Sequence, residues 1–171
     1  MILALFAAWH GAFEFGGAAR IDKESPYIHW ISKRPGEQIM SLSLGLEAGY
    51  RFFLGQTRWF IDPVFHVSAF FIVPALQGEV RIGRAFNKSM ALYGILGIGS
   101  LIMPDTRPIH HAIGVGFSWG FAKKWSLTGR LVHKFYHEHY FSNPQTKTLK
   151  GRNELFLTAG VEVHQSNFYR D

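Results

Sequence analysis

The sequence predicts an all-β protein, an eight-stranded antiparallel up-and-down barrel whose strands cross a membrane. Three observations predict this fold class: a long segment of strict alternation, the lack of an apolar run long enough for a membrane helix, and connections that alternate between long and short. The alternation is clearest in Met40–Phe52, where apolar residues alternate with polar or small ones without a slip. Strands of soluble proteins usually have about 5–6 residues, whereas a tilted membrane-spanning strand needs about 9–11. The apolar face of this segment is therefore expected to meet lipid.

Length and composition restrict the class further. The chain has 171 residues, which suits a single domain over residues 1–171. It has no run of about 18 apolar residues, so a closed barrel is the remaining way to span a bilayer with every backbone group paired. The absence of cysteine removes thiolate chemistry and fits export through an oxidising compartment. Two interpretations stay open for Met1–Ala8, a signal-peptide remnant or the start of the first strand.

Eight segments show the period of two that is typical of strands with one apolar face. In chain order they are Trp9–Arg20, Met40–Phe52, Trp59–Phe71, Gly78–Phe86, Ala91–Leu101, Ala112–Phe121, Trp125–Phe135 and Leu155–Val163. The apolar faces of the first four carry Phe13 and Phe15, Leu44 and Leu46, Phe65 and Val67, and Val80 and Ile82. Those of the last three carry Val115 and Phe117, Leu127 and Leu131, and Leu157 and Val161.

Three of these segments have a feature that departs from the simple pattern. The third contains Pro63, which weakens it near its start because proline cannot donate a ladder hydrogen bond. The fourth places Arg84 on the lipid face, close enough to the strand end to snorkel. The fifth is glycine-rich, so its faces stay unassigned and a bulge is compatible with it.

The connections alternate in length, as they do in outer-membrane barrels, which have short periplasmic turns and longer outer loops. The predicted turns are Leu54–Arg58, Asn87–Ser89 and Ala122–Lys124, and the predicted loops are Ile21–Gln38, Ile72–Gln77, Ile102–His111 and Tyr136–Glu154. Aromatic residues gather at the turn side, as in an interfacial girdle: Trp9, Phe52, Phe53, Trp59, Phe60, Trp119, Phe121 and Trp125. A soluble lipocalin-like barrel would reverse the two faces and explains neither feature. We therefore expect a bacterial outer-membrane location.

One hairpin resembles a known family. Gly114–Arg130, GVGFSWGFAKKWSLTGR, resembles a hairpin of small bacterial outer-membrane barrels, which include the OmpA-like transmembrane domain and the opacity-type surface proteins. The resemblance implies an eight-stranded outer-membrane barrel. That family usually ends on a terminal aromatic residue, whereas here the last segment continues into His164–Asp171.

The polar faces of the strands carry charges that would lie inside the barrel. We expect an interior charge network of Glu14, Glu47, Arg51, Asp62, Glu79, Arg81, Arg130, Lys134 and Glu162. An eight-stranded barrel is filled by side chains, and buried charges must be paired, so these residues are expected to form a plug. The resemblance to OmpA-like barrels suggests the alternative of a charge gate that passes small ions.

Histidines suggest a metal site, which the sequence does not complete. His110 and His111 fall in one predicted outer loop, and His137 and His139 in another, so four imidazoles could face one another at the rim. Imidazole suits Zn²⁺ or Cu²⁺. No cysteine or carboxylate completes a known spacing, so we expect no metal and no cofactor.

The predicted partners are lipids. The net charge is +6, and basic residues in the loops, Lys23, Lys33, Arg34, Arg107, Lys147, Lys150 and Arg152, suit the phosphates of lipopolysaccharide. We expect a monomer that contacts outer-membrane lipid, lipopolysaccharide and possible surface ligands through loops 21–38 and 136–154. Nucleic acid binding is not expected, because the bases do not gather on one face.

An enzymatic alternative rests on a second resemblance, to the lipid A 3-O-deacylase barrels. Arg130-Leu131-Val132-His133 is similar to the R-x-x-H part of their motif, and Glu154 downstream could orient His133 as in a serine-hydrolase triad. The nucleophile position is occupied by Phe135, and Ser142-Asn143 lies out of register. The sequence therefore favours a structural or surface-interaction role over catalysis.

Overall fold

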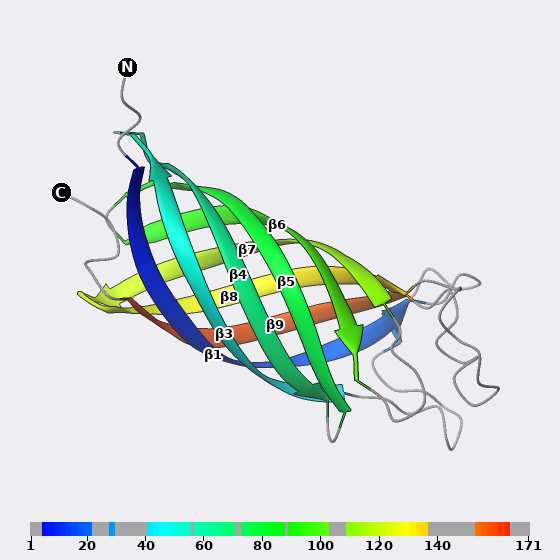
Figure 1. Cartoon of the computed structure of the whole chain (residues 1–171). Helices are drawn as coiled ribbons and strands as arrows, with labels where there is room; N and C mark the ends of the chain where they lie inside the picture. Colours follow the sequence, from blue (N-terminus) through cyan, green and yellow to red (C-terminus); the bar gives the residue numbers. More distant parts are fainter. Residues whose placement is uncertain are drawn as a thin grey trace.

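The computed structural model describes residues 5–21, 28–29, 41–55, 57–70, 73–87, 89–102, 109–136 and 153–164. Eight antiparallel strands form a closed barrel: β1 (Leu5–Ile21), β3 (Ser41–Leu54), β4 (Trp59–Phe70), β5 (Val73–Ala85), β6 (Met90–Leu101), β7 (Ile109–Ala122), β8 (Trp125–Tyr136) and β9 (Asn153–His164) (Figure 1). Each strand pairs with the next, and β1 pairs with β9 to close the barrel. The short β2 (Ile28–His29) adds to β1 outside this closed ring. No helix among the described residues is long and apolar enough to cross a membrane.

Three short turns join strands at one end of the barrel, called the turn end below; the opposite end is the loop end. Gly55 follows β3 with a φ of 61°, a conformation that glycine adopts without strain. In the β5–β6 turn, the Asn87 side-chain oxygen accepts hydrogen bonds from the amides of Ser89 and Met90, both at 2.8 Å. β1 begins and β9 ends at this same end (Figure 1).

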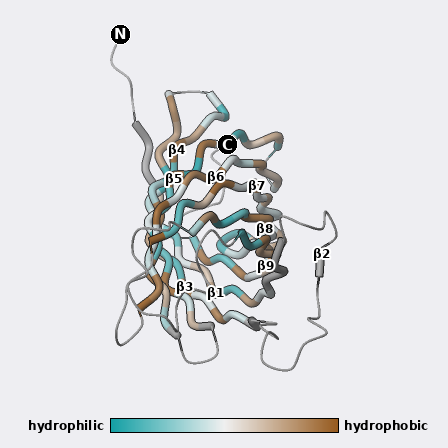
Figure 2. Tube along the Cα trace, turned by 90° about the vertical axis from the view of Figure 1, so that its right-hand side faces the viewer, coloured by the Kyte–Doolittle hydropathy of each residue, from teal (hydrophilic) through white to brown (hydrophobic). Residues whose placement is uncertain are grey.

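The two faces of the eight barrel strands differ in exposure, and hydropathy alternates along the chain trace (Figure 2). On the outer face Leu46 is 62% and Val115 60% exposed, whereas inside the barrel Arg81 is 1% and Glu162 0% exposed. A soluble barrel would have the opposite arrangement, because burying charges while exposing large apolar side chains to water is unfavourable. The outer wall is thus suited to lipid, and the predicted transmembrane barrel is confirmed.

The strands extend further toward the loop end than predicted. Residues 73–77 belong to β5, 109–111 to β7 and 153–154 to β9, so these parts of the predicted loops are wrong. Their backbone groups are paired with neighbouring strands, as in Gln77 opposite Gly99 and His111 opposite Phe135. Loops 21–38 and 136–154 are likewise too wide, because β1 includes Ile21, β8 includes Tyr136, and Ile28–His29 forms β2. Near the start of the sequence, Leu5–Ala8 lies in β1.

The structure also assigns faces that the sequence left open or that were predicted differently. In β6, Tyr93 and Ile95 point inward, and the pairings on both sides of β6 run without a shift. The irregularity lies instead between Gly120 and Ala122. Phe60 is fully buried inside the barrel, with the Phe53 ring 5.9 Å from it. The prediction that these two residues belong to the girdle is wrong. Each lies two positions from an inward-facing charged residue, Arg51 or Asp62, and so points to the same side of its strand.

Candidate functional site: the charged interior

The interior of the barrel holds all nine charged residues of the predicted network. Each is at most 6% exposed: Glu14, Glu47, Arg51, Asp62, Glu79, Arg81, Arg130, Lys134 and Glu162. They come from β1, β3, β4, β5, β8 and β9, and each projects inward because alternate residues of a strand point to one face. Glu154 and the imidazoles of His10, His66, His110 and His164 are buried with them.

Nearest the turn end, two carboxylates lie between an arginine and a histidine. Arg51 donates to Asp62 from Nε at 3.1 Å and from Nη2 at 3.0 Å, and its Nη2 also donates to Glu162 at 3.0 Å. The His10 ring lies between the same two acids, with Nε2 2.7 Å from Asp62 and Nδ1 2.8 Å from Glu162. The Phe60 ring packs against the guanidinium, 4.8 Å from its carbon. This arrangement joins β1, β3, β4 and β9 through one charged cluster.

Glu162 connects this cluster to two further strands. Its Oε2 accepts hydrogen bonds from Ser118 of β7 at 3.0 Å and from Ser126 of β8 at 3.1 Å. Ser126 is also 2.9 Å from the Nε2 of His164. The Glu162 carboxylate therefore faces an arginine, two hydroxyls and the imidazoles of His10 and His164, which satisfies both of its oxygens.

The middle of the barrel is crossed by two arginines and three glutamates. Arg81 donates to Glu47 through Nη1 at 2.9 Å and Nη2 at 2.5 Å, and to Glu79 through Nε at 3.1 Å. Arg130 donates through Nη1 to both oxygens of Glu79 at 3.1 Å and pairs through Nη2 with Glu14. Such fork-shaped pairing fixes geometry as well as charge. These residues link strands that are not neighbours in the sheet.

Toward the loop end, a chain of polar groups continues from Glu79. Gln77 donates to Glu79 at 2.7 Å, and its side-chain oxygen lies 2.8 Å from Nε2 of His110. Tyr136 donates to Glu154 at 3.1 Å, and Glu154 lies opposite Lys134 in the β8–β9 register. Lys134 also lies 4.4 Å from the centre of the Phe156 ring.

Apolar side chains fill the remaining interior, which the sequence did not predict. Buried residues from six strands pack together: Phe60, Ala85, Ala91, Tyr93, Ile95, Ala112, Val132 and Phe156. Tyr93 lies under Arg81, with 5.3 Å between the guanidinium carbon and the ring centre, so β6 also meets the charged network. The alternation of inward and outward residues would have been enough to place Phe60, Ser118 and Ser126 inside the barrel. Tyr93 could not be placed in this way, because it lies in the glycine-rich segment whose faces stayed unassigned.

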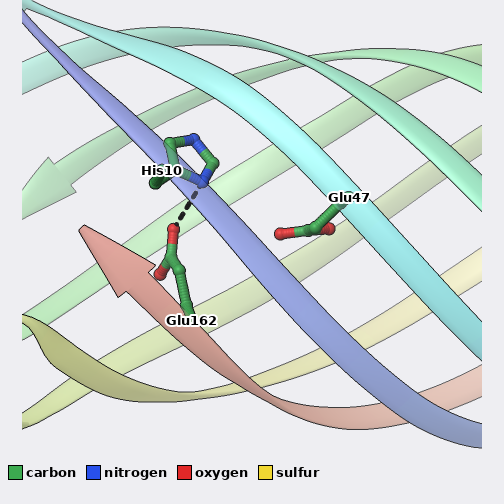
Figure 3. Close-up of side chains that lie close together, drawn as sticks. All are labelled: His10, Glu47 and Glu162. Carbon is green, nitrogen blue, oxygen red and sulfur yellow. Dashed lines mark ion pairs between the residues drawn. The ribbon is translucent and has the colours of Figure 1, made fainter. Parts of the chain in front are cut away.

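One trio of interior residues has a spacing compatible with a metal. Ligand atoms of His10, Glu47 and Glu162 lie within 4.8 Å of one another (Figure 3). However, the carboxylates are paired with guanidiniums, Glu47 with Arg81 and Glu162 with Arg51, and both ring nitrogens of His10 face acids. The two arginines already neutralise the carboxylates, and the imidazole is held by hydrogen bonds to acids. This trio therefore does not fit a metal ion.

The predicted histidine group is not assembled as expected. His110 and His111 lie in β7 rather than in a loop, and consecutive strand residues point to opposite faces. His110 is therefore buried inside the barrel and His111 is exposed on the wall. His137 and His139 lie outside the described residues.

The structure also separates the two residues of the enzymatic alternative. His133 pairs with Leu155 and lies on the outer wall, where its ring is 4.0 Å from that of Phe135. Glu154 is buried inside and accepts from Tyr136. Since a strand wall lies between the two side chains, the expectation that Glu154 orients His133 is wrong. Ser142 and Asn143 lie outside the described residues.

Comparison with known proteins shows the fold. No family model and no curated protein matches the sequence. Among solved structures, Neisserial surface protein A is 12% identical and aligns with a TM-score of 0.53, covering 92% of this chain and 98% of that one. The N-terminal β-barrel domain of Pseudomonas aeruginosa OprF is 13% identical, with a TM-score of 0.52 and coverage of 91% and 96%.

A third solved structure, the Yersinia pestis outer membrane protein Ail, is 12% identical with a TM-score of 0.48, covering 91% of this chain and 98% of that one. At such identities the likeness concerns the fold. The closed strand order and the likeness to Neisserial surface protein A and to the OprF barrel domain confirm the predicted eight-stranded barrel, and its lipid-suited wall agrees with a bacterial outer-membrane location.

Proposed function

We propose that this protein is a plugged outer-membrane barrel that stabilises the cell envelope and presents its outer loops as an interaction surface. The observation that carries the proposal is the interior charge network, which leaves Arg51, Arg81 and Arg130 each engaged with two or more acids. An eight-stranded barrel has room for its side chains and little else. The wall then serves as an anchor, and recognition falls to the segments beyond the strands.

Envelope lipid is the proposed partner at the loop end. The basic residues assigned to contacts with lipopolysaccharide lie in segments 22–27, 30–40, 103–108 and 137–152, outside the described residues. Loops 21–38 and 136–154, narrowed to the parts beyond the strands, remain the proposed interaction surface, and a single copy of the chain is sufficient to form the barrel. Each lysine or arginine near an anionic surface contributes about 1 kcal/mol to the attraction, so several basic residues together would bind lipopolysaccharide firmly.

Two measurements test this proposal. In planar bilayers the folded protein should show no steady conductance, and on intact cells protease should cut only between the strands at the loop end. Replacing residues 138–150 by a short Gly-Ser linker should weaken binding to vesicles containing lipopolysaccharide while leaving heat-modifiable gel migration unchanged. Steady conductance would overturn the plug, and cuts in the Lys123–Lys124 turn of intact cells would overturn the orientation.

A charge gate is a second candidate, favoured by one specific feature. Nη1 of Arg130 lies 3.1 Å from Glu79 and 3.4 Å from Glu47, so a small rotation of the guanidinium would exchange its partners. Exchange of partners among buried ion pairs is a way to open a path without unfolding the wall. Glu47→Ala should then raise the frequency of brief channel openings, and an unchanged conductance record would exclude the gate.

A further inference from the structure

Arg84 occupies an unusual position on the outer wall. Among the strand residues whose side chains are described, it is the one lysine, arginine, aspartate or glutamate that faces outward. The remaining outward residues are apolar, small or polar without a formal charge, together with His111 and His133. Charged side chains on the lipid face destabilise membrane barrels, least of all near the interface. A charge kept at such a position is a candidate for binding a group of opposite sign.

The surroundings of Arg84 belong to the membrane interface. Arg84 is the penultimate residue of β5 at the turn end, opposite Trp59 of β4, and its guanidinium carbon is 5.8 Å from the Trp59 ring centre. The adjacent Arg58 is exposed and donates a hydrogen bond to the Phe86 carbonyl. Lys123 and Lys124 are exposed in the β7–β8 turn at the same end of the barrel, but they do not line the groove described below. Tryptophan and cationic residues together are typical of the depth at which lipid phosphates lie.

An open apolar groove leads away from Arg84 across the wall. It is lined by Trp59 and Arg84 at one end and continues past Ile82, Leu92, Gly94 and Val115. Gly94 forms part of its floor: a Cβ added there would meet only the Ile82 carbonyl at 3.9 Å, so the space above this backbone is open. Gly17, further along the same groove, has nothing within 4 Å of such a Cβ. An open apolar groove with a cation at one end suits a phospholipid, whose charged headgroup continues into apolar chains.

We propose that this groove holds one phospholipid of the periplasmic leaflet, with its phosphate on Arg84 and one acyl chain along the floor at Gly94. The inference rests on the proposed membrane barrel, whose short turns face the periplasm. The positive charge of Arg58, which lies beside this end of the groove, favours an anionic headgroup over a zwitterionic one. Trp59 packs beside the guanidinium and positions it at headgroup depth.

The test uses the full chain in nanodiscs of equal parts phosphatidylglycerol and phosphatidylcholine, followed by native mass spectrometry of the lipid retained. The wild type should retain one phosphatidylglycerol. Arg84→Gln should lower retention about tenfold, the effect of losing one charge-assisted hydrogen bond. Gly94→Leu should lower it similarly by filling the groove while keeping the arginine. Lys123→Gln is the control, which removes the same charge away from the groove and should retain the lipid.

The outcomes separate this inference from the proposed function. Equal retention in wild type and Arg84→Gln, or no preference for phosphatidylglycerol, would overturn the lipid site and leave Arg84 as a snorkelling residue. That result, obtained with protein that inserts and migrates as a heat-modifiable band, leaves the membrane barrel intact. Failure of the wild type to insert into nanodiscs would overturn both.

Discussion

Arg81 and Glu47 meet inside the barrel as a two-pronged ion pair, with Nη1 2.9 Å from Oε1 and Nη2 2.5 Å from Oε2. They come from β5 and β3, which are not paired with each other, so the contact connects strands across the interior. Both side chains are nearly inaccessible to solvent, at 1% and 6% exposure for the whole residue. A pair of this kind holds the barrel in one register, because a shift of either strand would leave a charge unpaired.

Removing one partner of this pair should be costly. Arg81→Met removes the nearest cation of Glu47 and leaves Arg130, whose Nη1 is 3.4 Å away. The loss of a buried partner lowers the free energy of unfolding by about 3–5 kcal/mol. The double variant Arg81→Met with Glu47→Leu should recover much of the loss, because no charge is stranded. Urea unfolding in lipid vesicles, followed by tryptophan fluorescence, measures both. Equal stability of the single and double variants would contradict the pairing.

A charged side chain near the middle of the outer wall should destabilise the barrel. Leu46 lies mid-strand in β3 and is 62% exposed on the wall, so Leu46→Arg should lower the free energy of unfolding by about 2–4 kcal/mol in bilayers. The matched control is Leu92→Arg, at the height of Arg84 near the turn end, where the cost should fall to about 0–1 kcal/mol. The same unfolding experiment compares them. Equal costs at the two heights would mean that the membrane is not centred on the middle of the barrel.

Two adjacent glycines in β1 should respond differently to the same substitution. A Cβ on Gly16 would lie 2.5 Å from the Thr158 methyl and 2.6 Å from the Leu157 carbonyl, whereas at Gly17 it would meet nothing within 4 Å. Gly16→Ala should therefore lower the free energy of unfolding by about 1–3 kcal/mol, and Gly17→Ala should leave it unchanged or raise it slightly. Thermal unfolding followed by gel migration gives both values. A larger loss at Gly17 would show that the two faces of β1 are exchanged.

Expression of the protein should leave lipid A chemically unchanged. His133 faces outward and Glu154 inward, so they cannot act together on one substrate. Mass spectrometry of lipid A from expressing cells, beside cells that express His133→Ala, checks this expectation. A 3-linked acyl chain lost only with the wild-type protein would demonstrate a deacylase that uses other partners.

The period of two determined much of this protein without any tertiary information. Alternation alone places Leu46 on the wall and Glu47 inside, since consecutive side chains of an extended backbone point to opposite faces. The same rule places all nine network residues in the interior. It failed where polar residues continue a strand: Gln77, His110 and Glu154 were assigned to loops, yet their backbones are paired with neighbouring strands.

The partners within the interior were decided only by the closed barrel. Arg130 pairs with Glu14, 116 residues away in sequence, and Arg51 pairs with Glu162, 111 residues away. Nothing local links such residues, because their separation depends on strand register and on the pairing of β1 with β9. Side-chain direction follows from the local backbone and can be read along one strand, whereas pairing requires that all eight strands be placed together.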